Sequence, residues 1–78
     1  MATPSLEKRS MQVCGHRSSV ALEPEFWRVL ERAASLRGVS LTKLVGQIET
    51  DKPNPEQSLA SACRCFALAF VIGQRSAA

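Results

Sequence analysis

The segment His16-Arg17-Ser18-Ser19-Val20-Ala21-Leu22 is the clearest β-strand candidate in the sequence. Ser18, Val20 and Leu22 share one face of the strand, while Arg17, Ser19 and Ala21 share the other. Glu23-Pro24-Glu25 ends the strand, and Pro24 suits the first position of a helix. Because no other segment has the pattern of a strand as clearly, the backbone groups along its edges lack a partner. The same strand of a second copy is the simplest partner, which predicts an antiparallel ribbon between two subunits.

The chain is short and mildly basic, with 78 residues, a formal net charge of +3 and 45% hydrophobic residues. One domain of this size buries a modest share of its surface, so dimerisation would cover the excess of apolar groups. The positive charge permits binding to nucleic acid without requiring it. The three cysteines, an odd number, indicate free thiols in a cytoplasmic protein. The apolar run 65–73 is too short to cross a bilayer, so no membrane partner is expected.

The remaining segments predict a mainly α-helical chain with one short strand. Residues 1–9 have the composition of a disordered basic tail and 74–78 that of a frayed end, which leaves a domain at 10–73. Helices are expected at about 24–37, 41–49 and 57–72, from apolar positions that recur every three or four residues. The third is apolar on nearly all sides, so a partner subunit is its natural cover. The expected dimer core comprises Val20, Leu22, Phe26, Leu30, Leu44, Ile48, Phe66 and Phe70.

This order of strand, helix, Gly38-Val39-Ser40 turn and helix resembles the ribbon-helix-helix fold of the MetJ and Arc-like DNA-binding proteins. The run Gly15–Trp27 is similar to a Gly-His-Arg-Thr-Ser-x-x-Leu-Glu-x-x-Phe-Trp signature. That signature is typical of a small bacterial subfamily with an added third helix. The resemblance implies an intertwined homodimer whose ribbon enters the major groove of duplex DNA. It therefore implies a sequence-specific transcriptional regulator.

The resemblance also implies roles for individual residues. Arg17, Ser19 and Ala21 are expected to face the bases, although a polar residue is usual where Ala21 stands. Phosphate contacts are expected at the start of the second helix, where free N–H groups and the positive end of the helix dipole favour anions. A flexible basic arm would add contacts that do not depend on sequence. The expected phosphate-binding residues are Lys8, Arg9, Ser40, Leu41 and Lys43.

A second function stays open at this stage: a protein-interaction module, such as an antitoxin, that binds a partner protein through its helices. Catalysis is not expected, because the only histidine has no carboxylate near it in the sequence and no phosphate-binding loop is present. A metal site is not expected either. Cys63 and Cys65 are two residues apart on a helix and so lie on different faces, away from each other. No cofactor is predicted.

Overall fold

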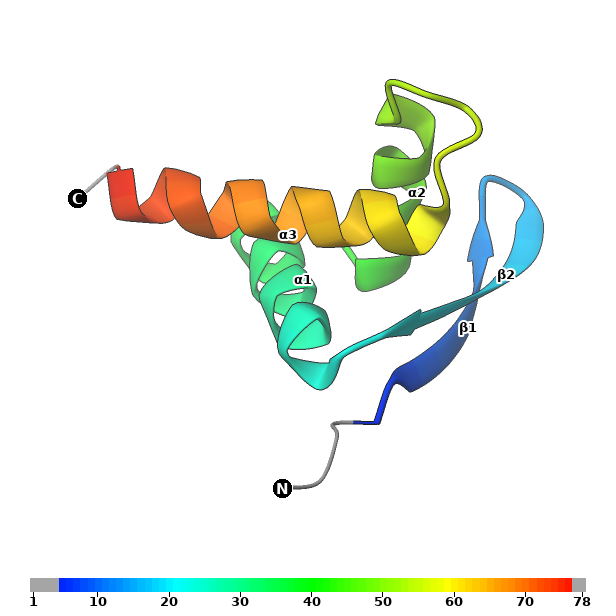
Figure 1. Ribbon diagram of the computed structural model, residues 1–78, viewed down its shortest axis with the longest axis horizontal. Coiled ribbons are helices and arrows are strands. Elements are labelled where there is room, and N and C mark those ends of the chain that lie inside the picture. The colour runs from blue at the N-terminus through cyan, green and yellow to red at the C-terminus, as the bar shows by residue number, and fades with distance from the viewer. Residues whose placement is uncertain (1–4, 77–78) are drawn as a thin grey trace.

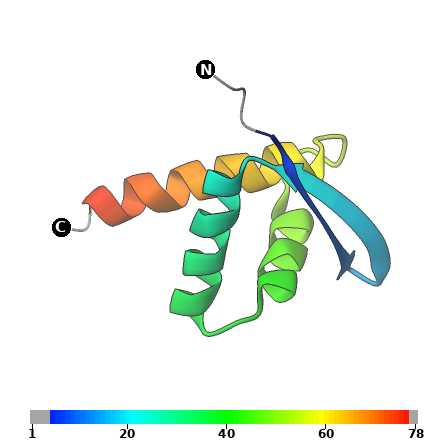
Figure 2. The same ribbon diagram turned by 90° about the horizontal axis from the view of Figure 1, so that it is seen from below.

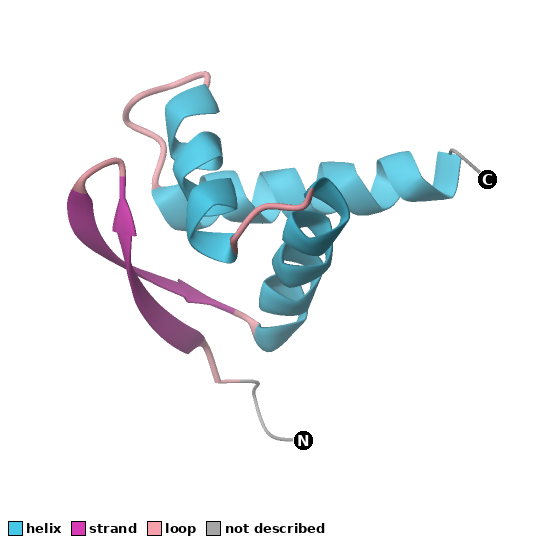
Figure 3. Cartoon of the chain, turned by 180° about the vertical axis from the view of Figure 1, so that it is seen from behind, coloured by secondary structure: helices cyan, strands magenta, loops and turns pink. Residues whose placement is uncertain are grey.

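A computed structural model of the chain describes residues 5–76. Two strands, β1 (Glu7–Val13) and β2 (His16–Leu22), precede three helices, α1 (Pro24–Arg37), α2 (Leu41–Asp51) and α3 (Leu59–Ser76). The helix α3 lies across α1 and α2, which run side by side beneath it (Figures 1 and 2). The two strands form a twisted ribbon beside α2, far from the C-terminal end of α3 (Figure 3).

The strands β1 and β2 pair antiparallel as a hairpin within one chain, with Val13 opposite His16 at the turn and Glu7 opposite Leu22 at the open end. Cys14 and Gly15 form the two-residue turn, and their φ angles are 52° and 84°. Positive φ at both central residues is the geometry of the type I′ turn, whose twist matches that of the flanking strands. Glycine adopts this conformation freely, whereas Cys14 is strained in it.

The expectation of a single strand is therefore wrong, and residues 7–9 belong to β1 rather than to a disordered tail. Residues 1–4 lie outside the described part of the chain. The premise that β2 lacks a partner within its own chain is also wrong, because β1 forms hydrogen bonds along one of its edges. Pairing of β2 between two subunits remains a prediction. The sequence obscured β1 because charged residues stand on both of its faces.

The helix ends follow local capping chemistry. Gly38 ends α1 in the left-handed conformation at φ 69°, as expected, and the N–H of Val39 donates to the Ala34 carbonyl. Ser40 caps α2, which continues two residues beyond the expected end, to Asp51. The third helix starts at Leu59, where Ser58 Oγ accepts a hydrogen bond from the N–H of Ser61. It continues to Ser76, so the frayed end expected from residue 74 is wrong for residues 74–76.

The core lies between the inner face of the ribbon and the three helices. β1 contributes Met11 and Val13, and Trp27 is fully buried beneath the ribbon. Every residue expected in a dimer core packs within the single chain: five are buried and three are partly buried against them. The buried five are Val20, Leu22, Leu30, Leu44 and Ile48, and the partly buried three are Phe26, Phe66 and Phe70. These residues thus pack within one chain, where β1 adds Met11 and Val13 to the same core, and their place in a dimer interface remains a prediction.

Candidate nucleic-acid interface

The solvent side of the hairpin is a polar surface built from both strands. Side chains alternate along each strand, so every second residue points away from the helices. Five of the six residues on this side are exposed and the sixth, Ala21, is partly exposed. None is acidic, and two are basic. We call this surface the outward ribbon face; it consists of Lys8, Ser10, Gln12, Arg17, Ser19 and Ala21.

The register arranges the outward ribbon face in three cross-strand pairs. Gln12 lies opposite Arg17, next to the turn, and Lys8 lies opposite Ala21, at the open end. Between them the hydroxyl oxygens of Ser10 and Ser19 are 3.0 Å apart and share a hydrogen bond. Arg17, Ser19 and Ala21 thus share one face, as expected from the period of the strand. Lys8 supplies a polar group beside the apolar Ala21.

Arg9 lies on the opposite, inner side of the ribbon. Its guanidinium donates to the carboxylates of Glu7 and Glu31 at 2.6 and 2.8 Å, and stacks 4.7 Å from the centre of the Trp27 ring. The hydrogen bond to Glu31 raises the pKa of Arg9, because that carboxylate favours the charged guanidinium. The expected place of Arg9 in a flexible arm is wrong, since its charge holds the ribbon to α1.

Trp27 completes this attachment. Its indole Nε1–H donates to the backbone carbonyl of Glu7 at 2.7 Å. The ring is fully buried, so this hydrogen bond also satisfies a polar group that would otherwise be costly to bury. Together Arg9 and Trp27 hold β1 in place and thereby position the β1 half of the outward ribbon face.

The first turn of α2 lies beside the turn end of the ribbon. Gln12 and Cys14 line the same groove as Thr42 and Lys43. Ser40 Oγ accepts a hydrogen bond from the N–H of Lys43 at 3.0 Å, as expected of an N-cap. The N–H groups at the start of a helix have no acceptor within the helix and carry its positive dipole end. The groove, which Asp51 also lines, therefore places a cationic side chain beside the start of α2.

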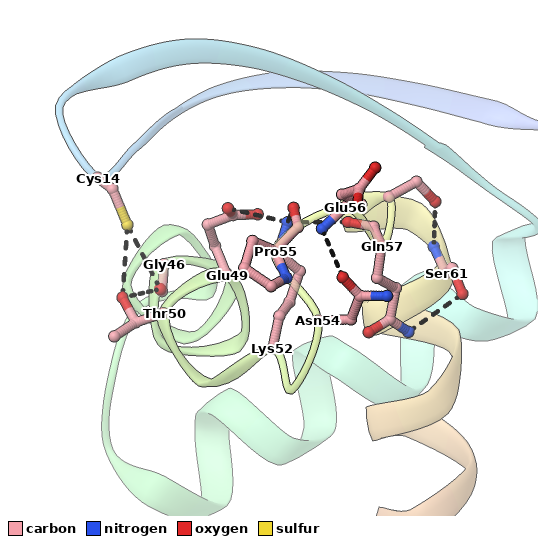
Figure 4. Close-up of polar contacts among 11 residues, drawn as sticks. Cys14, Gly46, Glu49, Thr50, Lys52, Asn54, Pro55, Glu56, Gln57 and Ser61 are labelled. Atoms are coloured by element: carbon pink, nitrogen blue, oxygen red, sulfur yellow. Dashed lines mark hydrogen bonds and ion pairs between the residues drawn. The ribbon is translucent and has the colours of Figure 1, made fainter.

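A sulfur contact fixes the ribbon against α2. Cys14 Sγ lies 3.6 Å from the Gly46 carbonyl oxygen and 3.6 Å from Thr50 Oγ1 (Figure 4). Thr50 in turn donates to the same carbonyl at 3.0 Å. The strained residue of the turn is therefore held against the middle and the last turn of α2, the helix that it faces.

The three cysteines are free thiols in different surroundings. Cys14 and Cys65 are exposed and Cys63 is buried. Burial raises the pKa of the Cys63 thiol to about 11, because the thiolate is costly in an apolar environment. Within residues 5–76, no group of three or more His, Cys, Asp or Glu side chains is placed to hold a metal ion. No helix in the same range is both long enough and apolar enough to cross a membrane.

The sequence model of the ribbon-helix-helix domain family matches residues 6–71, which is most of the chain. The chain belongs to the ribbon-helix-helix family. The resemblance stated from the sequence is thereby confirmed. Proteins of this family are in general DNA-binding regulators that dimerise, and they are not enzymes. Searches of curated proteins and of solved structures found no significant match to the chain.

In this ribbon-helix-helix chain, half of the outward ribbon face escaped the sequence reasoning. Ser10 and Gln12 were not singled out, and Lys8 was expected in a flexible arm rather than on a strand. A partial signal for them was present: Met11 and Val13 alternate with Ser10 and Gln12, and a two-residue segment ending in Gly15 separates them from β2. Cys14-Gly15 is not among the common turn pairs, which are Asn-Gly and Asp-Gly.

Proposed function

We propose that this chain is a sequence-specific DNA-binding regulator that inserts the outward ribbon face into the major groove. The observation that carries the proposal is the composition of that face. Both strands contribute exposed hydrogen-bonding side chains and no carboxylate stands among them to repel phosphate. A two-stranded β-ribbon is narrow enough to enter the major groove, where each base pair presents its own pattern of donors and acceptors.

Arg17 and Gln12 form the reading pair nearest the turn. An arginine makes a bidentate contact with guanine and a glutamine makes one with adenine, and the two side chains stand opposite each other on the ribbon. Ser19 is a less selective hydrogen-bonding group, and Ala21 suits the methyl group of thymine. Direct readout by Arg17, Ser19 and Ala21 is thus extended by a residue of β1.

Phosphate contacts come from the first turn of α2 and from the ribbon. Ser40 and Leu41 start the helix, and Lys43 points into the groove beside Gln12. Lys8 lies at the open end of the outward ribbon face and adds a second charge. These contacts orient the ribbon and supply affinity that falls with salt, whereas the base contacts supply specificity. Arg9 takes no part, because its guanidinium is bound to Glu7 and Glu31.

The proposed functional unit is a homodimer. Two copies present two ribbons, so the recognised sequence contains two half-sites related by the symmetry of the protein. Doubling the number of phosphate and base contacts also raises the affinity of so small a domain into the range of specific binding.

A fluorescence-anisotropy titration tests the DNA-binding proposal. A duplex selected from a random library by the wild-type protein is titrated with Arg17→Ala and, as a control with the same change of charge, Arg32→Ala on α1. We expect Arg17→Ala to cost about 1–3 kcal/mol, the value of one bidentate base contact. Arg32→Ala should change the affinity little, because Arg32 lies on α1 rather than on the outward ribbon face. Equal losses for the two variants would show that only net charge matters.

A further inference from the structure

A hollow of about 330 Å³ lies where α3 packs against α2, and we call it the α2–α3 hollow. Its apolar floor consists of Ile48, Ala62 and Phe66, of which the first two are buried and the third is partly buried. A volume of this size is at the lower end of the range for small-molecule sites, which are apolar hollows with a few polar groups at fixed places. No described residue that lines it belongs to the ribbon, so it is separate from the outward ribbon face.

Two of the polar side chains around the α2–α3 hollow already have partners. Lys52 Nζ pairs with the Glu49 carboxylate at 3.0 Å and donates to the Gln57 carbonyl oxygen at 2.8 Å. The side-chain amide of Gln57 donates to Ser61 Oγ at 3.2 Å. These contacts hold the loop between α2 and α3 (Figure 4). Because the Glu49 carboxylate balances the charge of Lys52, this lysine is not the group that a charged ligand would meet.

Two further charges at the α2–α3 hollow, of opposite sign, have no such partner. Arg37 reaches the hollow from the end of α1, and its guanidinium stacks 5.0 Å from the centre of the Phe66 ring. Asp51 reaches it from the last turn of α2. Both residues are exposed, and neither forms a salt bridge with another residue of the range 5–76. The N–H groups of Arg37 are therefore available to a carboxylate beside the apolar floor, and the Asp51 oxygens to a donor.

These two charges define which ligands suit the α2–α3 hollow. A ligand whose only charge is a carboxylate gains from Arg37 and is repelled by Asp51. A ligand whose only charge is an ammonium group gains from Asp51 and is repelled by Arg37. A molecule that carries both groups gains from both residues, and its apolar part removes the floor from water.

We propose that the α2–α3 hollow binds a small zwitterion with an apolar body, of which an α-amino acid with an apolar side chain is the simplest. Arg37 pairs with the carboxylate and Asp51 with the ammonium group, while the apolar side chain covers the floor. The site goes beyond the proposed DNA binding and does not depend on it, because the two surfaces share no described residue.

An NMR titration of the full chain with three matched probes tests the ligand class. L-phenylalanine carries both charges, 3-phenylpropanoate lacks the ammonium group, and 2-phenylethylamine lacks the carboxylate. We expect the amide signals of the hollow to shift on binding, and the two probes with one charge to bind about two- to fivefold more weakly than L-phenylalanine, the scale of one exposed ion pair. A probe with one charge that binds as tightly as L-phenylalanine would overturn the zwitterion. The absence of saturable shifts with all three would overturn the site.

Substitutions show which protein charge meets which group of the probe. Arg37→Gln should weaken the two probes that carry a carboxylate and spare 2-phenylethylamine. Asp51→Asn should weaken the two that carry an ammonium group and spare 3-phenylpropanoate. Arg32→Gln on α1 and Glu56→Gln before α3 are the matched controls, because they change the charge equally at residues that do not line the hollow. Equal losses for a variant and its control would refute the assigned pairing.

The free thiols supply a test that needs no substitution. Cys65 lines the α2–α3 hollow and is exposed, whereas Cys14 is also exposed but lies at the turn of the ribbon, outside the hollow. Saturating L-phenylalanine should slow the alkylation of Cys65 by iodoacetamide and leave that of Cys14 unchanged, as mass spectrometry of the peptides will measure. An unchanged rate at Cys65, or equal slowing of both thiols, would overturn binding in this hollow.

Discussion

Replacing Trp27 with phenylalanine should loosen β1 more than any other part of the molecule. The indole donates a hydrogen bond of 2.7 Å to the Glu7 carbonyl, is fully buried, and stacks under the Arg9 guanidinium at 4.7 Å. Loss of the hydrogen bond costs about 1 kcal/mol. The smaller ring leaves space in the core at a further cost of roughly 1–2 kcal/mol, a fraction of the 3–5 kcal/mol typical of truncation to alanine. We expect the free energy of unfolding to fall by about 2–3 kcal/mol.

This loss is large for a chain of 78 residues, whose total stability is on the order of 4–12 kcal/mol. Urea unfolding followed by circular dichroism at 222 nm measures this loss of stability. Fluorescence is unsuitable, because Trp27 is the only tryptophan and its replacement removes the signal. Amide hydrogen exchange shows where in the molecule the stability is lost. Protection of the β1 amides should fall, whereas protection of the α2 amides should change only with the global stability. Phe26→Leu, which alters the neighbouring and only partly buried ring, is the control. A loss below about 0.5 kcal/mol, within the range of ordinary surface substitutions, would refute the role of Trp27 as the anchor of the ribbon.

Three further outcomes follow from particular contacts. Ser40→Ala should lower the free energy of unfolding by about 1 kcal/mol and weaken DNA binding. Ser40→Gly should lower the free energy of unfolding by only about a few tenths of a kcal/mol. Thermal denaturation measures the stability and fluorescence anisotropy measures the DNA binding. Cys14→Val should destabilise the fold by about 1–2 kcal/mol in urea titrations, because a β-branched residue strongly disfavours the positive φ of the turn; Cys14→Gly, which relieves the strain but also removes the sulfur contacts, should cost less. The hydrogen bond from Arg64 holds the pKa of Glu23 below its ordinary value of 4.5, so this pair stabilises the fold above that pH and its contribution is lost as the pH falls through the lowered pKa. Glu23→Gln should therefore flatten the acid side of a plot of stability against pH, and an unchanged slope would contradict the assignment.

The features predicted well from the sequence are those that depend on neighbours along the chain. The alternation of Val20 and Leu22 with Arg17 and Ser19 located β2 and its two faces. Gly38 and Ser40 marked the end of one helix and the start of the next, since the left-handed cap and the N-cap involve residues at most a few positions apart. The apolar character of α3 on nearly all sides was also evident, and its outer side is indeed uncovered in the single chain.

The features that only the tertiary structure decided depend on residues far apart in the sequence. Arg9 stands at an inward position of β1, where an apolar side chain would have revealed the strand. Its partial burial is tolerated because Glu31, 22 residues away, and the face of Trp27 meet it there. The partner of β2, and with it half of the outward ribbon face, was therefore hidden until those contacts were known. The neighbour of a strand is determined by how both faces of the strand pack against residues distant in the sequence. Local periodicity shows only that the strand needs a neighbour.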